Sequence, residues 1–352
     1  MKKKRIKQLC LSTTLALGTI LCVENCYAYQ FLEDTNYMFR NPADVSFYIE
    51  HDYDYYDTYA PLIKEYVPKW NINSEIKAYF KDSASANVHF YFSTLDNGLY
   101  GECDALNKSR RNINLYRAWF KTDLTKKAET VVHEMGHAFG LAHTQSYNDS
   151  ISVMREFGFN NKPYPLEDDR NAIAALTNGG YREFPEKQLR KEKNIPAKTD
   201  VFNSLEEMEK YSPIIIKGRK MIEEEPSYEF NKKGEIITSY TLSKVEVEEI
   251  IKDDANELDI GKNISILENE ALNIMTQQIE HRANYKKMET DKEYYLFIYK
   301  ASNGEWYIPS GVTFGKIPID ENEEMLYKEN SKRDSALYPQ EKIAKEVYEK
   351  YK

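Results

Sequence analysis

Cysteine is scarce in this sequence, and most of it lies at one end. The chain of 352 residues has four cysteines: Cys10, Cys22 and Cys26 lie near the N-terminus, and only Cys103 follows. A framework of disulfides is therefore excluded as the source of stability. We expect Cys103 to be a small buried hydrophobic residue rather than a reactive thiol.

An excess of positive charge is also missing. The formal charge is -9, which argues against a nucleic-acid partner because phosphate binding requires a basic surface. Hydrophobic residues make up 41% and charged residues 30% of the chain, a balance typical of folded globular proteins. The length is sufficient for two domains.

The N-terminal apolar run, residues 9–23, is too short for a membrane span, which needs about 20 residues. Basic residues precede it, and Cys26-Tyr27-Ala28 places small residues where signal peptidases cut. We therefore predict a signal peptide over 1–28, cleavage after Ala28, a secreted protein and no membrane span in the mature chain. Cleavage would remove five basic residues and Glu24, so the charge would change from -9 to -13. An uncleaved anchor is the less favoured alternative.

Residues 29–180 show a mixture of strand and helix patterns that predicts an α+β domain. The runs 45–49, 88–92 and 113–116 are typical of strands, and His89 is expected on the polar face of the second one. A helix is predicted over 124–141, with Asp123 or Thr122 as its cap.

The rest of the chain has a different pattern. Residues 181–203 are charged and interrupted by prolines, which favours a linker. Short runs of β-type residues separated by turn signals then predict a small all-β domain over 204–330, either a barrel or a sandwich. Residues 331–352 are predicted to form a polar helix or a tail.

The most informative segment is His-Glu-Met-Gly-His-Ala-Phe-Gly-Leu-Ala-His at residues 133–143. His133 and His137 are four residues apart, so both imidazoles project from one face of a helix and can bind one zinc ion. Gly140 can adopt positive φ, end the helix and return His143 as the third ligand. Three protein ligands leave a fourth position for water, as in catalytic zinc sites. Glu134, beside the first ligand, is the expected general base.

On these residues the sequence resembles the metzincin clan of metallopeptidases, and within it the matrixin-like family. Ser152-Val153-Met154 matches the methionine turn beneath the zinc of that clan, which gives Met154 a supporting role. Residues 166–170 resemble the start of the helix that closes the domain. The resemblance covers 37–176 and implies a twisted sheet over the helix that carries the active site, with a substrate cleft.

Some residues depart from the family pattern. Glu156 stands where some metzincins carry a tyrosine that faces the zinc. The loop containing Asp96 and Asp104 has no histidine, so a second, structural zinc is not expected. These acids could hold calcium, but their spacing matches no EF-hand and a solvated loop is expected instead. We also expect no cysteine-bearing prodomain between Ala28 and the first strand.

The predicted function is that of a secreted zinc metalloendopeptidase that hydrolyses peptide bonds of extracellular proteins through a zinc-bound water. Phe157, Phe159 and Tyr164 follow the methionine turn and suggest an apolar residue after the cut. The alternative is a non-catalytic extracellular binding module on a peptidase scaffold. For the β domain we favour an independent accessory barrel on a flexible linker over an OB- or netrin-like domain that covers the cleft. The oligomeric state is left open by the sequence.

Overall fold

A computed structural model describes residues 29–32, 39, 42–51, 54–107, 109–145, 148–177, 191–327 and 339–352. The predicted signal peptide and residues 181–190 of the predicted linker lie outside the described residues. Among the helices within these ranges, none combines the length and the apolar character that a membrane span requires.

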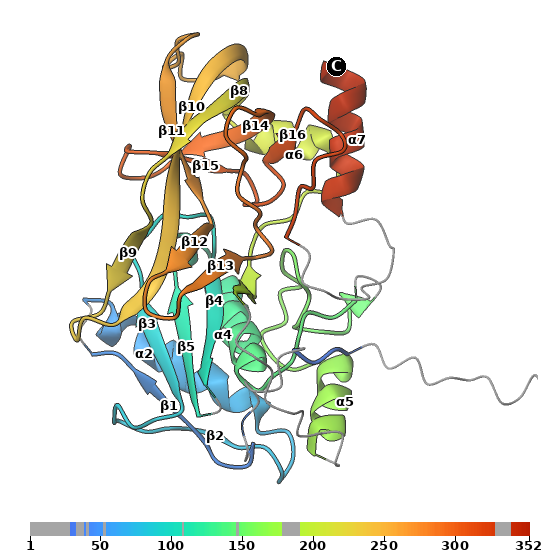
Figure 1. Ribbon diagram of the computed structural model, residues 1–352. Coiled ribbons are helices and arrows are strands. Elements are labelled where there is room, and N and C mark those ends of the chain that lie inside the picture. Colours follow the sequence, from blue (N-terminus) through green and yellow to red (C-terminus); the bar gives the residue numbers. More distant parts are fainter. Residues whose placement is uncertain are drawn as a thin grey trace, which may run out of the picture.

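A six-stranded sheet forms the centre of the N-terminal half (Figure 1). Its strands in spatial order are β2 (Ala78–Phe80), β1 (Val45–Ile49), β3 (Val88–Phe92), β5 (Arg110–Leu115), β4 (Gly101–Asn107) and β7 (Ala197–Lys198). The first four are mutually parallel, whereas β4 runs antiparallel to β5, and β7 runs antiparallel to β4. The three strands predicted in this half are confirmed.

Helices cover one face of this sheet. They are α2 (Tyr56–Tyr66), the 3-10 helix η2 (Val67–Trp70), α3 (Arg117–Lys121) and α4 (Leu124–Ala138), and α5 (Glu167–Ala175) closes this half of the chain. Trp70 is fully buried and its Nε1 donates to the carbonyl oxygen of Val132, 2.9 Å away. This contact ties the early helix to the helix that carries the histidine motif.

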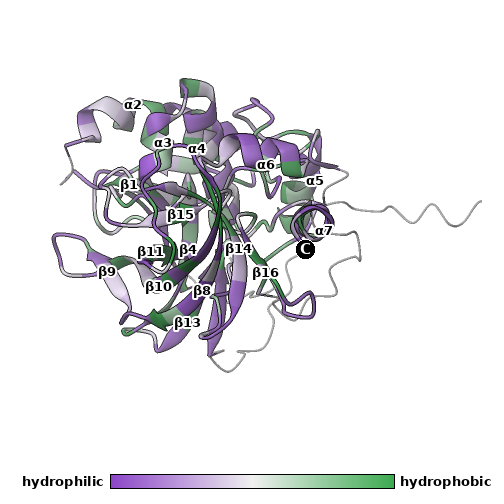
Figure 2. Ribbon diagram, turned by 90° about the horizontal axis from the view of Figure 1, so that it is seen from above, coloured by the Kyte–Doolittle hydropathy of each residue, from purple (hydrophilic) through white to green (hydrophobic). Residues whose placement is uncertain are grey.

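A closed ring of five strands forms the second half. The strands β8 (Ile214–Glu223), β10 (Ile236–Asp253), β11 (Asn263–Glu268), β15 (Tyr307–Pro309) and β14 (Glu293–Lys300) each pair with the next, and β14 pairs with β8. β9 (Ser227–Phe230) and β16 (Lys316–Pro318) add to β10 and β14. Apolar and polar residues alternate along β10, so one side faces a core of aliphatic residues (Figure 2). Of the two predicted forms, the structure has the barrel.

Two helices cover the outside of the barrel. α6 (Leu205–Tyr211) and α7 (Pro339–Tyr351) pack against the outer face of β14 and β16. Figure 2 shows α7 beside these strands. Ile343 and Val347 point from α7 into this contact and are buried. The C-terminal segment is therefore a helix with one apolar face rather than a tail.

The expectation of a linker over 181–203 is wrong for the second part of this range. β6 (Glu192–Ile195) joins β12 (Glu270–Asn273) and β13 (Gln278–Arg282) in a three-stranded sheet, and β7 joins the first sheet. Sequence patterns could not show this because the segment pairs with strands that are distant in the chain. Pro196 stands between the paired residues of β6 and those of β7.

The two halves share a buried interface, so the expectation of an independent barrel on a flexible linker is also wrong. Figure 1 shows β10 running from the barrel down to the first sheet. Asn114 on β5 donates to the carbonyl oxygen of Ile237 at 2.5 Å, and Trp306 donates to that of Asp96 at 3.0 Å. An apolar cluster crosses the same boundary; it includes Leu95, Leu99, Tyr116, Leu267, Tyr285, Ile308 and Val312.

This interface explains why His89 is buried rather than on a solvated face. Its side chain is 0% exposed, and burial lowers its pKa to about 4. Arg110 and the carbonyl oxygen of Ala84 hydrogen-bond to the ring. The charges of Lys233 and Glu235, on the turn that leads into β10, reach the ring as well. Both faces of the strand that carries His89 are therefore buried. Alternation of polar and apolar residues along a strand predicts one buried and one solvated face, so it could not predict this.

Arg282 provides a test of this interface. Its Nε lies 2.9 Å from Glu102 on β4, and a terminal nitrogen lies 2.9 Å from Glu280. Arg282→Ala would leave two buried carboxylates unpaired, so we expect a loss of about 3–5 kcal/mol in the free energy of unfolding. Because the pair joins the halves, the loss should appear in a single cooperative transition in urea, followed by circular dichroism and tryptophan fluorescence.

Arg219→Ala is the matched control, since Arg219 makes two carboxylate contacts on the outside of the barrel, with Glu248 and Glu293. Little change in stability is expected there. Two separate transitions, with only the barrel destabilised by Arg282→Ala, would contradict the shared interface.

Candidate active site

The active-site helix α4 begins and ends as its sequence requires. The Asp123 side chain accepts a hydrogen bond from the Lys126 N–H at 2.9 Å, so Asp123 rather than Thr122 is the cap. The helix ends at Ala138, three residues before the predicted end. Gly140 has φ of +100°, and its N–H bonds to the carbonyl oxygen of His137 at 2.8 Å. This left-handed residue turns the chain back towards the helix, as predicted.

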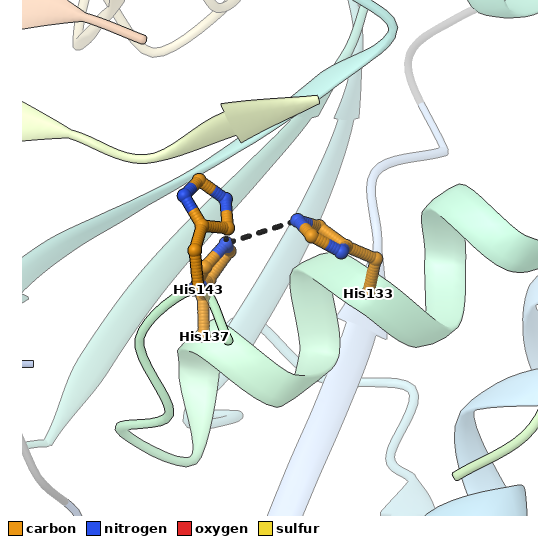
Figure 3. Close-up of side chains that lie close together, drawn as sticks. All are labelled: His133, His137 and His143. Atoms are coloured by element: carbon orange, nitrogen blue, oxygen red, sulfur yellow. Dashed lines mark hydrogen bonds between the residues drawn. The ribbon is translucent and has the colours of Figure 1, made fainter. Parts of the chain in front are cut away.

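The turn brings His143 to the two helical histidines (Figure 3). Nε2 of His137 lies 3.1 Å from Nε2 of His133 and 3.1 Å from Nε2 of His143. All three side chains are buried. Within the described residues, this is the one cluster of three or more metal-ligating side chains.

The spacing fits a single zinc ion. Tetrahedral ligands at the usual Zn–N distance of about 2.0–2.1 Å are about 3.3 Å apart, close to the two distances seen here. The other ring nitrogens of two histidines are already used: Nδ1 of His133 lies 2.8 Å from the Val153 carbonyl oxygen, and Nδ1 of His137 lies 2.7 Å from that of Leu141. Such bonds fix the tautomer and turn Nε2 towards the metal position.

Glu134 lies beside these rings and is 0% exposed. Neither carboxylate oxygen has a hydrogen-bond partner among the described residues. Burial raises its pKa well above the usual range, while the positive charge and the main chain of Lys198 oppose the shift weakly. β4 passes close to it, since a Cβ at Gly101 would lie 3.1 Å from Glu134 Cγ. Cys103 on the same strand is buried, and burial raises its pKa, so it remains a thiol.

Met154 packs beneath the helix. A Cβ at Gly136, between the first two histidines, would lie 2.3 Å from the Met154 sulfur, so the turn and the helix are in direct contact. Asp169 holds this turn: its carboxylate accepts hydrogen bonds from Ser152 Oγ at 2.5 Å and from the Val153 N–H at 2.8 Å. Since the Val153 carbonyl also bonds to His133, Asp169 positions a candidate ligand. The sequence indicated a helix start here but not this role.

Two further carboxylates lie close to the site, and sequence reasoning missed the role of one of them, Glu129. Glu129, one turn before the motif, is 0% exposed and accepts the N–H groups of Asn160 and Lys162 at 3.0 and 3.1 Å. It therefore orders the loop that follows the methionine turn. Glu156 lies 4.0 Å from Nδ1 of His143, close to the third candidate ligand. No local pattern indicated the contacts of Glu129, whereas Glu156 stands at the position where some metzincins carry a tyrosine that faces the zinc.

The acids of the Asp96 loop are used in other ways. Asp96 pairs with Lys121 at 3.1 Å and accepts from the Ser302 N–H at 3.1 Å. Asp104 pairs with Lys193. The expected solvated loop is wrong for Asp96, which is buried, and these cationic partners leave no reason to place calcium there.

Comparison with known proteins agrees with this geometry at a coarse level. The model of metallopeptidase family M12B, described as reprolysin-like, matches residues 27–144, a range that contains all three histidines. No curated protein matches the chain. This match and the histidine cluster fit a metallopeptidase domain with one catalytic zinc ion. The matched model is M12B, so the matrixin-like subtype stays a prediction.

Two solved structures show a weak similarity. They are titled "Structure of myroilysin" and "Crystal structure of myroilysin", with 19% and 18% sequence identity. They cover 44% and 47% of this chain and 68% and 80% of their own chains, with TM-scores of 0.25 and 0.24. At these scores the likeness carries no argument about the present site.

Asp169→Ala tests the support of the methionine turn. The change would leave Ser152 Oγ and the N–H groups of Val153 and Leu166 without their acceptor and release Val153 from its position. We expect zinc affinity to fall about 10–100-fold, because supporting residues of metal ligands typically have effects of this size. The free energy of unfolding should fall by about 1–3 kcal/mol. Competition with a fluorescent chelator and urea titration measure the two effects.

Asp168→Ala is the control, because the neighbouring carboxylate bonds to Thr144 Oγ1 and not to the turn. Equal losses of zinc affinity in both variants would show that Asp169 has no specific role in positioning His133.

Proposed function

We propose that this protein is a zinc-dependent endopeptidase, with His133, His137 and His143 as the zinc ligands and Glu134 as the general base. The observation that carries the proposal is the convergence of three Nε2 atoms beside a buried carboxylate that no other side chain uses. A bound zinc ion supplies Lewis-acid polarisation of a peptide carbonyl and lowers the pKa of water.

Residues of this chain would then supply proton transfer, orientation of the zinc ligands and packing beneath them. Glu134 accepts a proton at its carboxylate and returns it to the departing amine. The carbonyl groups of Val153 and Leu141 keep the imidazoles of His133 and His137 oriented. Met154 acts as packing beneath the ligands.

The proposal also covers the peptidase subtype, the location of the protein and the class of substrate. The methionine turn supports a metzincin of matrixin-like character, and the M12B match supports the metzincin type more generally. The N-terminal sequence supports secretion after cleavage at Ala28, and hence proteins or peptides outside the cell as substrates. The net negative charge of the chain argues against a nucleic-acid partner. An OB- or netrin-like relationship of the barrel rests on its five strands and sequence pattern alone.

A second candidate function is a non-catalytic binding module on a peptidase scaffold. The observation that favours it is the complete burial of Glu134, which a substrate cannot reach in this conformation. The presence of all four proposed active-site residues argues for the enzyme instead.

Glu134→Gln separates the two candidates. The zinc ligands are untouched, so we expect about one zinc per chain in both proteins, measured by atomic emission. Cleavage of casein and of quenched peptides should fall about 10²–10⁴-fold, the usual contribution of a general base. A chelator should abolish the activity of the unmodified protein, and added zinc should restore it.

Glu229→Gln is the control for removing a half-buried carboxylate away from the site; Glu229 lies on β9 and bonds to Ser93. It should keep the activity of the unmodified chain. A Glu134→Gln variant as active as the unmodified chain would contradict the peptidase proposal.

A further inference from the structure

The strand β7 runs along the candidate cleft. It pairs antiparallel with β4, with Lys198 opposite Gly101 and Ala197 opposite Glu102. The Tyr100 N–H donates to the Lys198 carbonyl oxygen at 2.9 Å. On the other side, the Gly158 N–H donates to the Thr199 carbonyl oxygen at 3.0 Å. The segment is thus held between β4 and the loop after the methionine turn.

The Lys198 side chain fills a pocket between α4 and that loop. Lys198 is 0% exposed, and its Nζ donates to the Arg155 carbonyl oxygen at 2.9 Å. The ring of Phe159 lies 5.4 Å from the same nitrogen. Burial lowers the pKa of Lys198 to about 8; the charges of Glu129, Glu134 and Asp149 oppose this shift, and the charge of Arg155 adds to it. The carbonyl oxygen of Arg155 and the ring of Phe159 are the groups that suit a cationic side chain at this place.

Lys198 lies close to the active site. Its charge acts on both Glu134 and His133, and β7 packs against α4, the helix that carries these two residues. An extended peptide that binds an exposed strand edge forms the same main-chain hydrogen bonds that β7 forms with β4. A substrate and β7 cannot use this edge at the same time.

We propose that residues 196–199 are a built-in occupant of the substrate cleft that keeps the peptidase latent, and that the pocket filled by Lys198 selects a lysine or arginine side chain in substrates. This inference rests on the proposed function. It differs from the apolar preference suggested by Phe157 and Phe159. Phe157 packs instead on Phe314 of the second half, with ring centroids 5.4 Å apart.

Lys198→Asp in the full chain tests latency. The new carboxylate would face Glu129 and Asp149 in a buried pocket, so β7 should leave β4 in a larger fraction of molecules. We expect the initial rate of cleavage of a quenched lysine-containing peptide to rise at least about tenfold, in proportion to the open fraction. Hydrogen exchange of the amides of residues 99–103 should accelerate in parallel. Lys198→Arg, which keeps the cation, should behave like the unmodified chain.

Lys316→Asp is the control for a general loosening of the fold. Lys316 is also a buried lysine, with a pKa that burial lowers to about 8, but it lies on β16 in the barrel. It should not accelerate cleavage. Equal activation by both substitutions, or equal rates in Lys198→Asp and the unmodified chain despite faster exchange in the former, would overturn the latency proposal.

Two synthetic peptides test the selectivity of the pocket. One has the sequence of residues 192–202, and the other has norleucine in place of Lys198. The first should inhibit the Lys198→Asp enzyme at least about tenfold more strongly, and equal inhibition would overturn the assignment of the pocket. If zinc-loaded Lys198→Asp shows faster exchange yet cleaves no peptide, the peptidase function itself fails, and latency with it. Hydrogen exchange together with the cleavage rate thus distinguishes a failure of the peptidase function from a failure of the proposal that residues 196–199 occupy the cleft.

Discussion

The contact on which the site depends is the packing of helix α4 against the turn that contains Met154. Gly136 leaves room for the Met154 sulfur, and the close approach lets the Val153 carbonyl reach the ring of His133. Asp169 fixes the turn from the other side through buried hydrogen bonds. The imidazoles face one point because helix, glycine turn and methionine turn are each held by buried polar contacts, which leave few alternative arrangements.

The same helix faces strand β4, and that strand connects the site to the second half of the chain. Glu102 on β4 pairs with Arg282, while Gly101 on the same strand lies against Glu134 and pairs with Lys198. The second half of the chain is therefore joined to the strand that borders the candidate site. Any opening of the cleft has to break main-chain pairing along β4 and remove a buried lysine from its pocket, which ties access to the stability of this interface.

Several features were predictable because they depend on residues close together in the chain. Strands at 45–49 and 88–92 followed from period-two patterns, and the cap at Asp123 and the turn at Gly140 followed from local backbone chemistry. Short β-type runs predicted an all-β domain that is either a barrel or a sandwich, but they did not predict that the strands close into a ring. Other features were not predictable: His89 lies on a face that looks polar, and it is buried because a second domain covers that face.

The histidine and glutamate set could be identified from residues close together in the chain, because the spacing of His133, Glu134 and His137 on a helix fixes their geometry within one turn. The tertiary structure alone decided what surrounds that set. Residues 192–203 look like a linker, since hydrogen bonding to distant strands leaves no local pattern. Folding nevertheless places Lys198 beside Glu134, from a position 64 residues further along the chain. Pairing between strands that are distant in the chain depends on how both halves pack. The periodic pattern of a short segment carries no information about that packing.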